Sequence, residues 1–164
     1  MVSTRSRQIR WRQRTPVDHI RSGHLTPLLT QYPDARFVLM HIAYLYSEEV
    51  LALAKHYPNV AVDLCWAWSI NPYAAADFVR RYIHAAPANK LFVFGGDTHF
   101  PAATLAYSRQ ARASLTRALQ AEVDDGLLTE PEAIFLAERF MTSNQAKYSA
   151  LDRKKATLRH EASV

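Results

Sequence analysis

The sequence has one cysteine, Cys65, so the chain cannot form an internal disulfide or a cysteine-rich zinc site. Only four glycines stand beside eight prolines, which excludes collagen-like and glycine-rich low-complexity sequence. No apolar run reaches the roughly 18 residues that a membrane-spanning helix needs. The first twenty residues also lack the apolar segment of a secretory signal. We therefore expect a cytoplasmic protein.

What the sequence does have is enough apolar material for one folded domain. It is 164 residues long, 49% hydrophobic and 21% charged, which differs from the composition of disordered chains. The net charge of +5 lies at the two ends, because residues 1–21 hold six arginines against one acid. We expect three parts: a disordered basic arm over 1–21, a β/α domain over 22–151 and a basic tail over 152–164. We interpret the ends as solubilising tails and do not expect nucleic acid as a partner.

Short apolar runs alternate with helical patterns along the body of the chain. Strands are predicted over 36–41, 60–64 and 90–94. Helices are predicted between and after these strands. Their starts are marked by Ser47 as an N-cap, by Asn71-Pro72, and by Thr129 with Glu132 as a capping box. A long helix is predicted over about 102–123. This alternation predicts a parallel sheet whose strands are buried on both faces by helices.

Polar residues stand at the predicted strand ends. His41 ends the first strand, Asp63 lies near the end of the second, and Asp97 follows the third. Since right-handed crossovers place the carboxyl ends of parallel strands at one edge, we expect His41 and Asp97 to lie side by side there. His41 could bind metal, polarise a carbonyl or shuttle a proton; the alternative is a hydrogen-bonded core histidine. Asp97 could bind metal and take a proton from water; the alternative is an N-cap or Asx turn.

Other side chains near these ends are weaker candidates. His99 would face the same way as Asp97 in an extended stretch, and with His41 the three could form a zinc site; His99 could equally be a loop residue. Trp66 and Trp68 could form the wall of a substrate pocket, or pack in the core. Cys65 is interpreted as a small buried apolar residue, because no histidine stands at a spacing that would activate it.

Three stretches of the sequence carry a family resemblance. They are 32–41, which ends at His41, 57–63, which ends at Asp63, and 89–97, which ends at Gly95-Gly96-Asp97. In this order they resemble successive late strands of the amidohydrolase superfamily, in particular its amidohydrolase-related (amidohydrolase 2) branch. The predicted helix pair from Ala133 to Tyr148 is similar to the C-terminal cap of that branch. The resemblance covers residues 24–150 or so.

The resemblance implies a fold and a chemistry. The family fold is a (β/α)₈ barrel that holds one or two divalent metals, commonly zinc, and acts by hydrolysis through a metal-activated water or by decarboxylation. By position, His41 is similar to the strand-six histidine that contacts metal or substrate. Asp97 is similar to the strand-eight aspartate that binds metal and handles the proton. We therefore expect a metal-dependent hydrolase or decarboxylase of a small polar substrate. We expect a divalent metal, zinc, to be held by His41 and Asp97 only together with further ligands supplied from outside this chain.

The sequence also departs from the family pattern. The His-x-His pair of strand one and the histidine of strand five are absent. A complete barrel needs about 250 residues. We therefore expect an α/β fold that is a partial (β/α)₈ barrel, roughly its last three β/α units plus C-terminal helices, from a truncated protein with little turnover of its own.

One further expectation follows from an incomplete sheet, and two alternatives to a hydrolase stay open. Its exposed edges could lead to self-association. The alternative to a hydrolase is a non-catalytic α/β module whose basic ends bind nucleic acid or an acidic partner, and a third possibility is a remnant without function.

Overall fold

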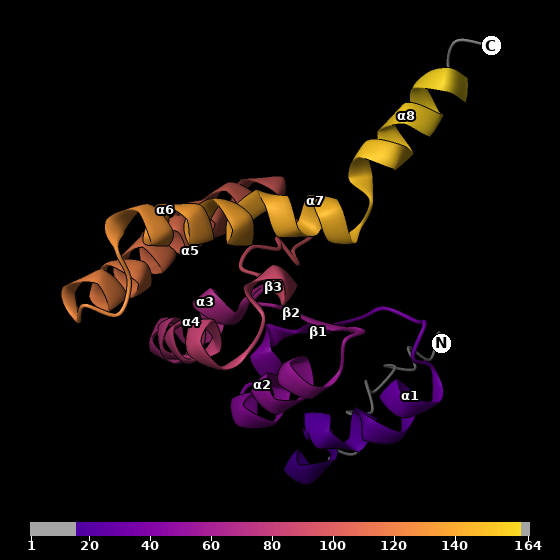
Figure 1. The fold of residues 1–164 in the computed structure, drawn as a ribbon, viewed down its shortest axis with the longest axis horizontal. Helices are drawn as coiled ribbons and strands as arrows, with labels where there is room; N and C mark the ends of the chain where they lie inside the picture. The colour runs from indigo at the N-terminus through magenta and orange to yellow at the C-terminus, as the bar shows by residue number, and fades with distance from the viewer. Residues whose placement is uncertain (1–15, 162–164) are drawn as a thin grey trace, which may run out of the picture.

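The computed structural model describes residues 16–161. Three strands lie at its centre: β1 (Phe37–Met40), β2 (Val60–Asp63) and β3 (Leu91–Phe92). The helices are α1 (Thr26–Gln31), α2 (Ser47–His56), α3 (Ala67–Ile70), α4 (Pro72–Ala85), α5 (Pro101–Asp124), α6 (Glu130–Glu138), α7 (Asn144–Tyr148) and α8 (Leu151–Glu161). Figure 1 shows the short strands between α1 and α2 on one side and α5 to α7 on the other.

The sheet is parallel, with the strand order β1-β2-β3. Each strand is followed by helix before the next strand begins, so the predicted α/β fold of three late β/α units with C-terminal helices is confirmed. The register pairs Met40 with Asp63, and Asp63 with Phe92. The carboxyl ends of the three strands therefore meet at one edge, as the sequence predicts.

Two of the three predicted helix starts form as expected. Asn71 accepts hydrogen bonds from the backbone N–H groups of Tyr73 and Ala74, both at 3.1 Å, and so caps α4. The Glu132 carboxylate accepts the backbone N–H of Thr129 at 2.8 Å at the start of α6. The third prediction is wrong, because Ser47 is the first residue of α2 and Tyr46 occupies the capping position without a side-chain bond.

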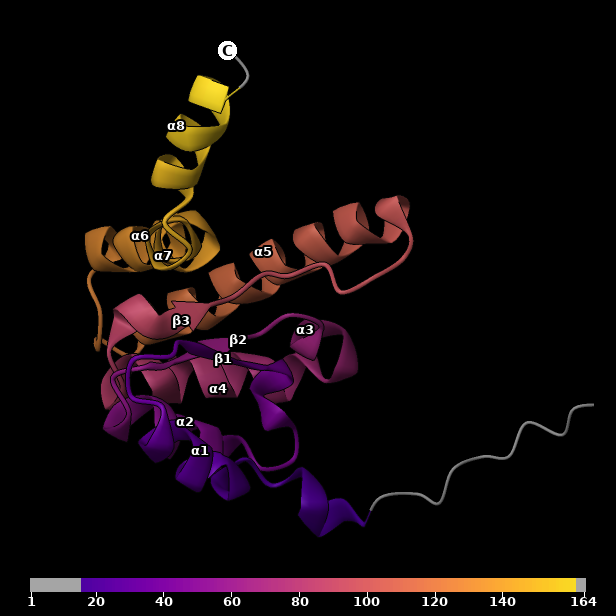
Figure 2. The same ribbon diagram turned by 90° about the vertical axis from the view of Figure 1, so that its right-hand side faces the viewer.

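The main core lies between one face of the sheet and the helices. Leu39 of β1, Val62 of β2 and Leu91 of β3 point to this face, where residues of α2, α4 and α5 pack against them. Figure 2 shows α2 and α4 together on one side of the strands. Burial of these apolar side chains supplies the main driving force for folding.

The opposite face of the sheet is only partly covered. Val38 and Met40 of β1 remain 40% and 46% exposed, whereas Ala61 of the central strand is fully buried. The prediction that β1 is buried on both faces is therefore wrong. Phe92 of β3 packs edge-on against Tyr148 of α7, with ring centroids 5.3 Å apart, so a C-terminal helix covers this face at β3 and leaves it open at β1.

The outer edge of β3 is held by a π-helical turn, Arg139–Ser143, that joins α6 to α7. There the Phe140 carbonyl accepts the backbone N–H of Val93 at 3.1 Å. The buried Asn144 side chain donates to the carbonyls of Ala88 and Leu91, at 2.7 and 2.8 Å. Here the carbonyl of a residue in the π turn takes its partner from Val93, directly after β3.

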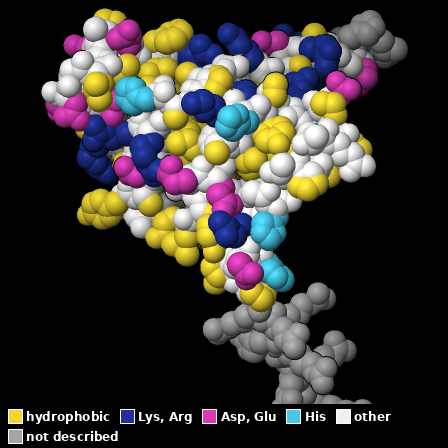
Figure 3. Space-filling view, turned by 60° about the horizontal axis from the view of Figure 1, so that its bottom comes forward, with side chains coloured by type: hydrophobic (Ala, Val, Ile, Leu, Met, Phe, Trp, Pro, Cys, Tyr) yellow, Lys and Arg dark blue, Asp and Glu magenta, His cyan; other side chains and the backbone are white. Residues whose placement is uncertain are grey.

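The two basic ends are described only in part. Residues 1–15 and 162–164 of the expected arm and tail lie outside the described residues. Within the arm, Val17–Ile20 form a 3₁₀ turn and Arg21 pairs with Glu49 of α2 at 2.7 Å. The tail forms α8, which extends away from the domain (Figure 1). On the face drawn in Figure 3, basic and acidic side chains intermingle. Among the described residues, no helix is long and apolar enough to cross a membrane.

Candidate functional site

The candidate site is built at the carboxyl ends of the three strands. His41 directly follows β1, Cys65 lies two residues after β2, and Asp97 lies in the glycine-containing loop after β3. The Nε2 atom of His41 lies 3.0 Å from Oδ2 of Asp97, although 56 residues separate them in sequence. Both side chains are partly open to solvent, at 37% and 43%. The pair that the sequence predicts is therefore formed at an accessible edge of the sheet.

The backbone around this edge takes conformations that side chains other than glycine rarely adopt. His41, Ile42 and Ala43 have φ values of 62°, 50° and 42°, and Trp66 and Asp97 have φ values of 62° and 34°. Ile42 is β-branched, for which positive φ is especially unfavourable. These positions follow all three strands. Such local strain concentrates at functional sites, where it aims side chains.

Cys65 is the donor that the sequence does not reveal. Its thiol is buried, and the Sγ atom lies with His41 Nε2 and a carboxylate oxygen of Asp97 in a group of atoms all within 4.8 Å of one another. The close approach depends on Gly95, because a Cβ atom there would lie 2.9 Å from the sulfur. Burial, with the nearby carboxylates of Asp63 and Asp97, raises the pKa of Cys65 to about 11. Without a metal, the thiol is therefore protonated at neutral pH.

Asp63 supports the turn that carries Cys65. Its Oδ1 atom accepts the backbone N–H of Cys65 at 2.7 Å, which fixes the loop directly after β2. Burial raises the pKa of Asp63, while the bond from Cys65 and the nearby His41 act in the opposite direction. Asp63 thus positions the loop and does not belong to the three-donor group.

The weaker sequence candidates are found in different places. Trp66 is 44% exposed and lies edge-on to the His41 ring, with centroids 6.0 Å apart. Trp68 is buried in the core, and its indole N–H donates to the Val93 carbonyl at 2.8 Å. His99 is exposed and is not part of the donor group, whose third member is Cys65. The N-cap alternative for Asp97 does not hold, since Phe100 occupies the N-cap position of α5.

The donor types match a divalent metal of the zinc class. Imidazole nitrogen, thiolate sulfur and carboxylate oxygen are the three kinds of protein ligand that zinc takes. Each strand end contributes one of them. Bonds of about 2.0–2.3 Å to a tetrahedral ion place its ligand atoms roughly 3.3–3.7 Å apart. His41 Nε2 and Asp97 Oδ2 are 3.0 Å apart, and no two ligand atoms of the group are more than 4.8 Å apart, so shifts of about 1 Å reach that spacing.

A second polar group, remote from the strand ends, was not anticipated. Glu122 of α5 is buried, and it pairs with Arg80 and His84 of α4. Arg80 also pairs with Asp125. Burial opposes ionisation of Glu122, but the hydrogen bonds from Arg80 and His84 outweigh it and lower the pKa of the carboxyl. This group joins α4 to α5.

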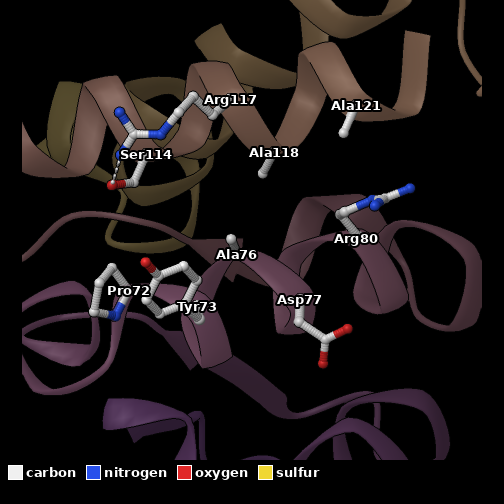
Figure 4. Close-up of a pocket in the computed structure, with 9 residues that line it drawn as sticks. All are labelled: Pro72, Tyr73, Ala76, Asp77, Arg80, Ser114, Arg117, Ala118 and Ala121. Atoms are coloured by element: carbon white, nitrogen blue, oxygen red, sulfur yellow. Dashed lines mark hydrogen bonds between the residues drawn. The ribbon is translucent and has the colours of Figure 1, made fainter. Parts of the chain in front are cut away.

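A cavity of about 420 Å³ lies between the same two helices (Figure 4). Tyr73 and Arg80 line it from α4, and Arg117 from α5, where Arg117 donates to the Ser114 hydroxyl at 3.1 Å. Its lining includes none of the three strand-end donors. The cavity is therefore separate from the candidate site.

The fold and the strand-end donors define a parallel β/α domain with a candidate metal centre. The chain matches the amidohydrolase family model over residues 11–132, and it belongs to that family. It is 30% identical over 132 residues to Protein fluG of Emericella nidulans. The aligned region covers 79% of this chain and 15% of the relative.

A solved structure shares the fold. It is that of a proposed metal-dependent hydrolase from Lactobacillus casei, with a TM-score of 0.60 and 18% identity. The match covers 79% of this chain and 34% of the other. The chain thus spans a minor part of the length of both proteins.

Proposed function

We propose that the strand-end site is the centre of a metal-dependent hydrolase that acts on a small polar substrate. The observation that carries the proposal is the 3.0 Å approach of His41 Nε2 to Asp97 Oδ2. Membership of the amidohydrolase family supports it, because this pair stands at the ends of the first and third strands of the matched segment. Decarboxylation at the same centre remains the variant of this function that the family resemblance also allows.

The residues have separate roles in this proposal. A divalent metal bound here would polarise a substrate carbonyl and make a water more acidic. His41 and Asp97 would hold it through the two atoms that now face each other. The second carboxylate oxygen of Asp97 would take the proton from the attacking water and later pass it to the leaving group. Trp66 would flank the substrate at the rim beside His41.

Hydrolysis of 4-nitrophenyl acetate, a generic activated ester, tests this proposal. Metal-free full-length chain is assayed with added zinc and compared with zinc in buffer alone. We expect zinc-dependent hydrolysis that falls at least a hundredfold or so in Asp97→Asn, because the proton acceptor is lost. Asp34→Asn, at an exposed turn, is the matched control and should keep the rate. Hydrolysis that does not depend on zinc, or that persists in Asp97→Asn, would contradict the proposal.

A further inference from the structure

The metal centre proposed above has only two donors that match the family, whereas catalytic zinc sites usually have three protein ligands. We propose that the Cys65 thiolate is the third protein ligand, so that this centre prefers thiophilic ions such as zinc, cobalt and cadmium over magnesium and manganese. The inference rests on the proposed metal site and specifies its chemistry.

The geometry supports this role for Cys65. Its Sγ atom shares one group with His41 Nε2 and the Asp97 carboxylate, with all ligand atoms within 4.8 Å. The three donors come from three successive strand ends, so the sheet itself holds them together. The loop is fixed by the 2.7 Å bond from the Cys65 N–H to Asp63. The sulfur therefore lies close to both the imidazole nitrogen and the carboxylate oxygen.

Gly95 supplies a second, independent observation. An added Cβ at this position would approach the Cβ and Sγ atoms of Cys65 to 2.8 and 2.9 Å, which no ordinary side chain tolerates. Gly95 has no positive φ, so its backbone conformation does not itself require glycine. The absence of a side chain therefore serves the close approach of the β3 loop to Cys65, which brings Asp97 towards the sulfur.

Binding changes only the protonation of the thiol. The S–H bond breaks, the proton passes to buffer, and the sulfur electron pair forms the bond to the metal, with no change in oxidation state. A soft sulfur ligand favours zinc and cadmium, whereas magnesium and manganese favour sites made of oxygen. The buried position of Cys65 leaves His41 and Asp97 as the donors on the solvent side, where a substrate would enter.

Cobalt(II) titration of the full-length chain under nitrogen tests the inference. Thiolate-bound cobalt has a charge-transfer absorption in the near ultraviolet that nitrogen and oxygen ligands do not produce. Because Cys65 is the only cysteine in the chain, such a band can come from no other residue. We expect the band to saturate at one equivalent of cobalt per chain. Its absorbance per chain should not depend on protein concentration, which distinguishes a site within one chain from a bridge between two chains.

Two variants complete the experiment. In Cys65→Ser the band should vanish while weaker cobalt binding through His41 and Asp97 persists, and zinc affinity should fall at least tenfold or so. His56→Ala, on the exposed end of α2, should leave both unchanged. Cobalt binding without the band in the unaltered chain would overturn the Cys65 assignment and leave the proposed metal centre standing. No cobalt binding in the unaltered chain would overturn both.

Discussion

The Nε2 atom of His41 and the Oδ2 atom of Asp97 lie 3.0 Å apart at one edge of the sheet. His41 directly follows β1, and Asp97 lies in the loop beyond β3. The central strand separates their parent strands, so their meeting depends on the parallel order β1-β2-β3. The loop after β2 brings the Cys65 sulfur close to both of them, within the same donor group. One point of the fold thus collects a side chain from each of its three β/α units.

Gly95→Ala should disturb this arrangement. The new methyl group would lie 2.8 Å from the Cβ of Cys65, and overpacking of this kind costs about 1–3 kcal/mol. We expect a lower free energy of unfolding in urea and a weaker cobalt–thiolate band. Gly96→Ala is the control, because its Cβ would meet Thr104 at 3.2 Å and the Thr104 side chain can shift. Equal losses in both variants would show that Gly95 has no special part in the site.

Glu122→Gln should destabilise the packing of α4 against α5. The substitution removes a buried carboxylate that accepts hydrogen bonds from Arg80 and His84, and such charged bonds contribute about 1.5–3 kcal/mol. The exposed Asp125, which pairs with the same arginine, is the control, and Asp125→Asn should cost at most about 1 kcal/mol. Urea unfolding at neutral pH measures both. A larger loss in Asp125→Asn would contradict this account.

The same carboxylate should make stability depend on pH. Hydrogen bonds from Arg80 and His84 hold the pKa of Glu122 below its ordinary value of 4.5. Its contribution is therefore complete above that value and is lost as the pH falls through the lowered folded-state pKa. We expect the stability difference between the unaltered chain and Glu122→Gln to shrink between pH 7 and about pH 3. If the stability difference between the two proteins grew on acidification, the pKa of Glu122 would have to be raised by folding, which would contradict this account.

Asn144→Ala should loosen the attachment of the C-terminal helices to β3. The side chain donates to the carbonyls of Ala88 and Leu91, and its loss leaves buried acceptors unpaired at a cost of about 1–3 kcal/mol. Asn89→Ala is the control, because this neighbouring asparagine is exposed and should change stability by less than about 0.5 kcal/mol. Similar denaturation midpoints for the two variants would contradict the structural role of Asn144.

The sequence predicts the strands, their parallel order and the meeting of His41 with Asp97, because apolar runs and strand-end polar residues are local features. Cys65 was interpreted as an inert apolar residue, since its place in the site depends on the β3 loop approaching through Gly95. The sequence signal for this close approach is Gly95, which stands directly before Gly96-Asp97. Glu122 was missed for a similar reason: an acid in a long helix usually faces solvent, and only the packing of α4 on α5 buries it.

The extent of the strands was also overestimated. The run 90–94 predicts five strand residues, but β3 pairs only over Leu91–Phe92. Beyond it, Val93 donates to Phe140 of the π-helical turn instead of to a strand. That partner lies far along the chain, and hydrophobic periodicity does not identify it.

The most direct test of the metal centre is an anomalous difference map at the zinc edge from crystals of the full-length chain grown with zinc. The account predicts one strong peak per chain at the strand ends, bonded to His41 Nε2, the Asp97 carboxylate and Cys65 Sγ. A map with no peak at the strand ends, or with zinc bound only by His84 and Glu122, would contradict it.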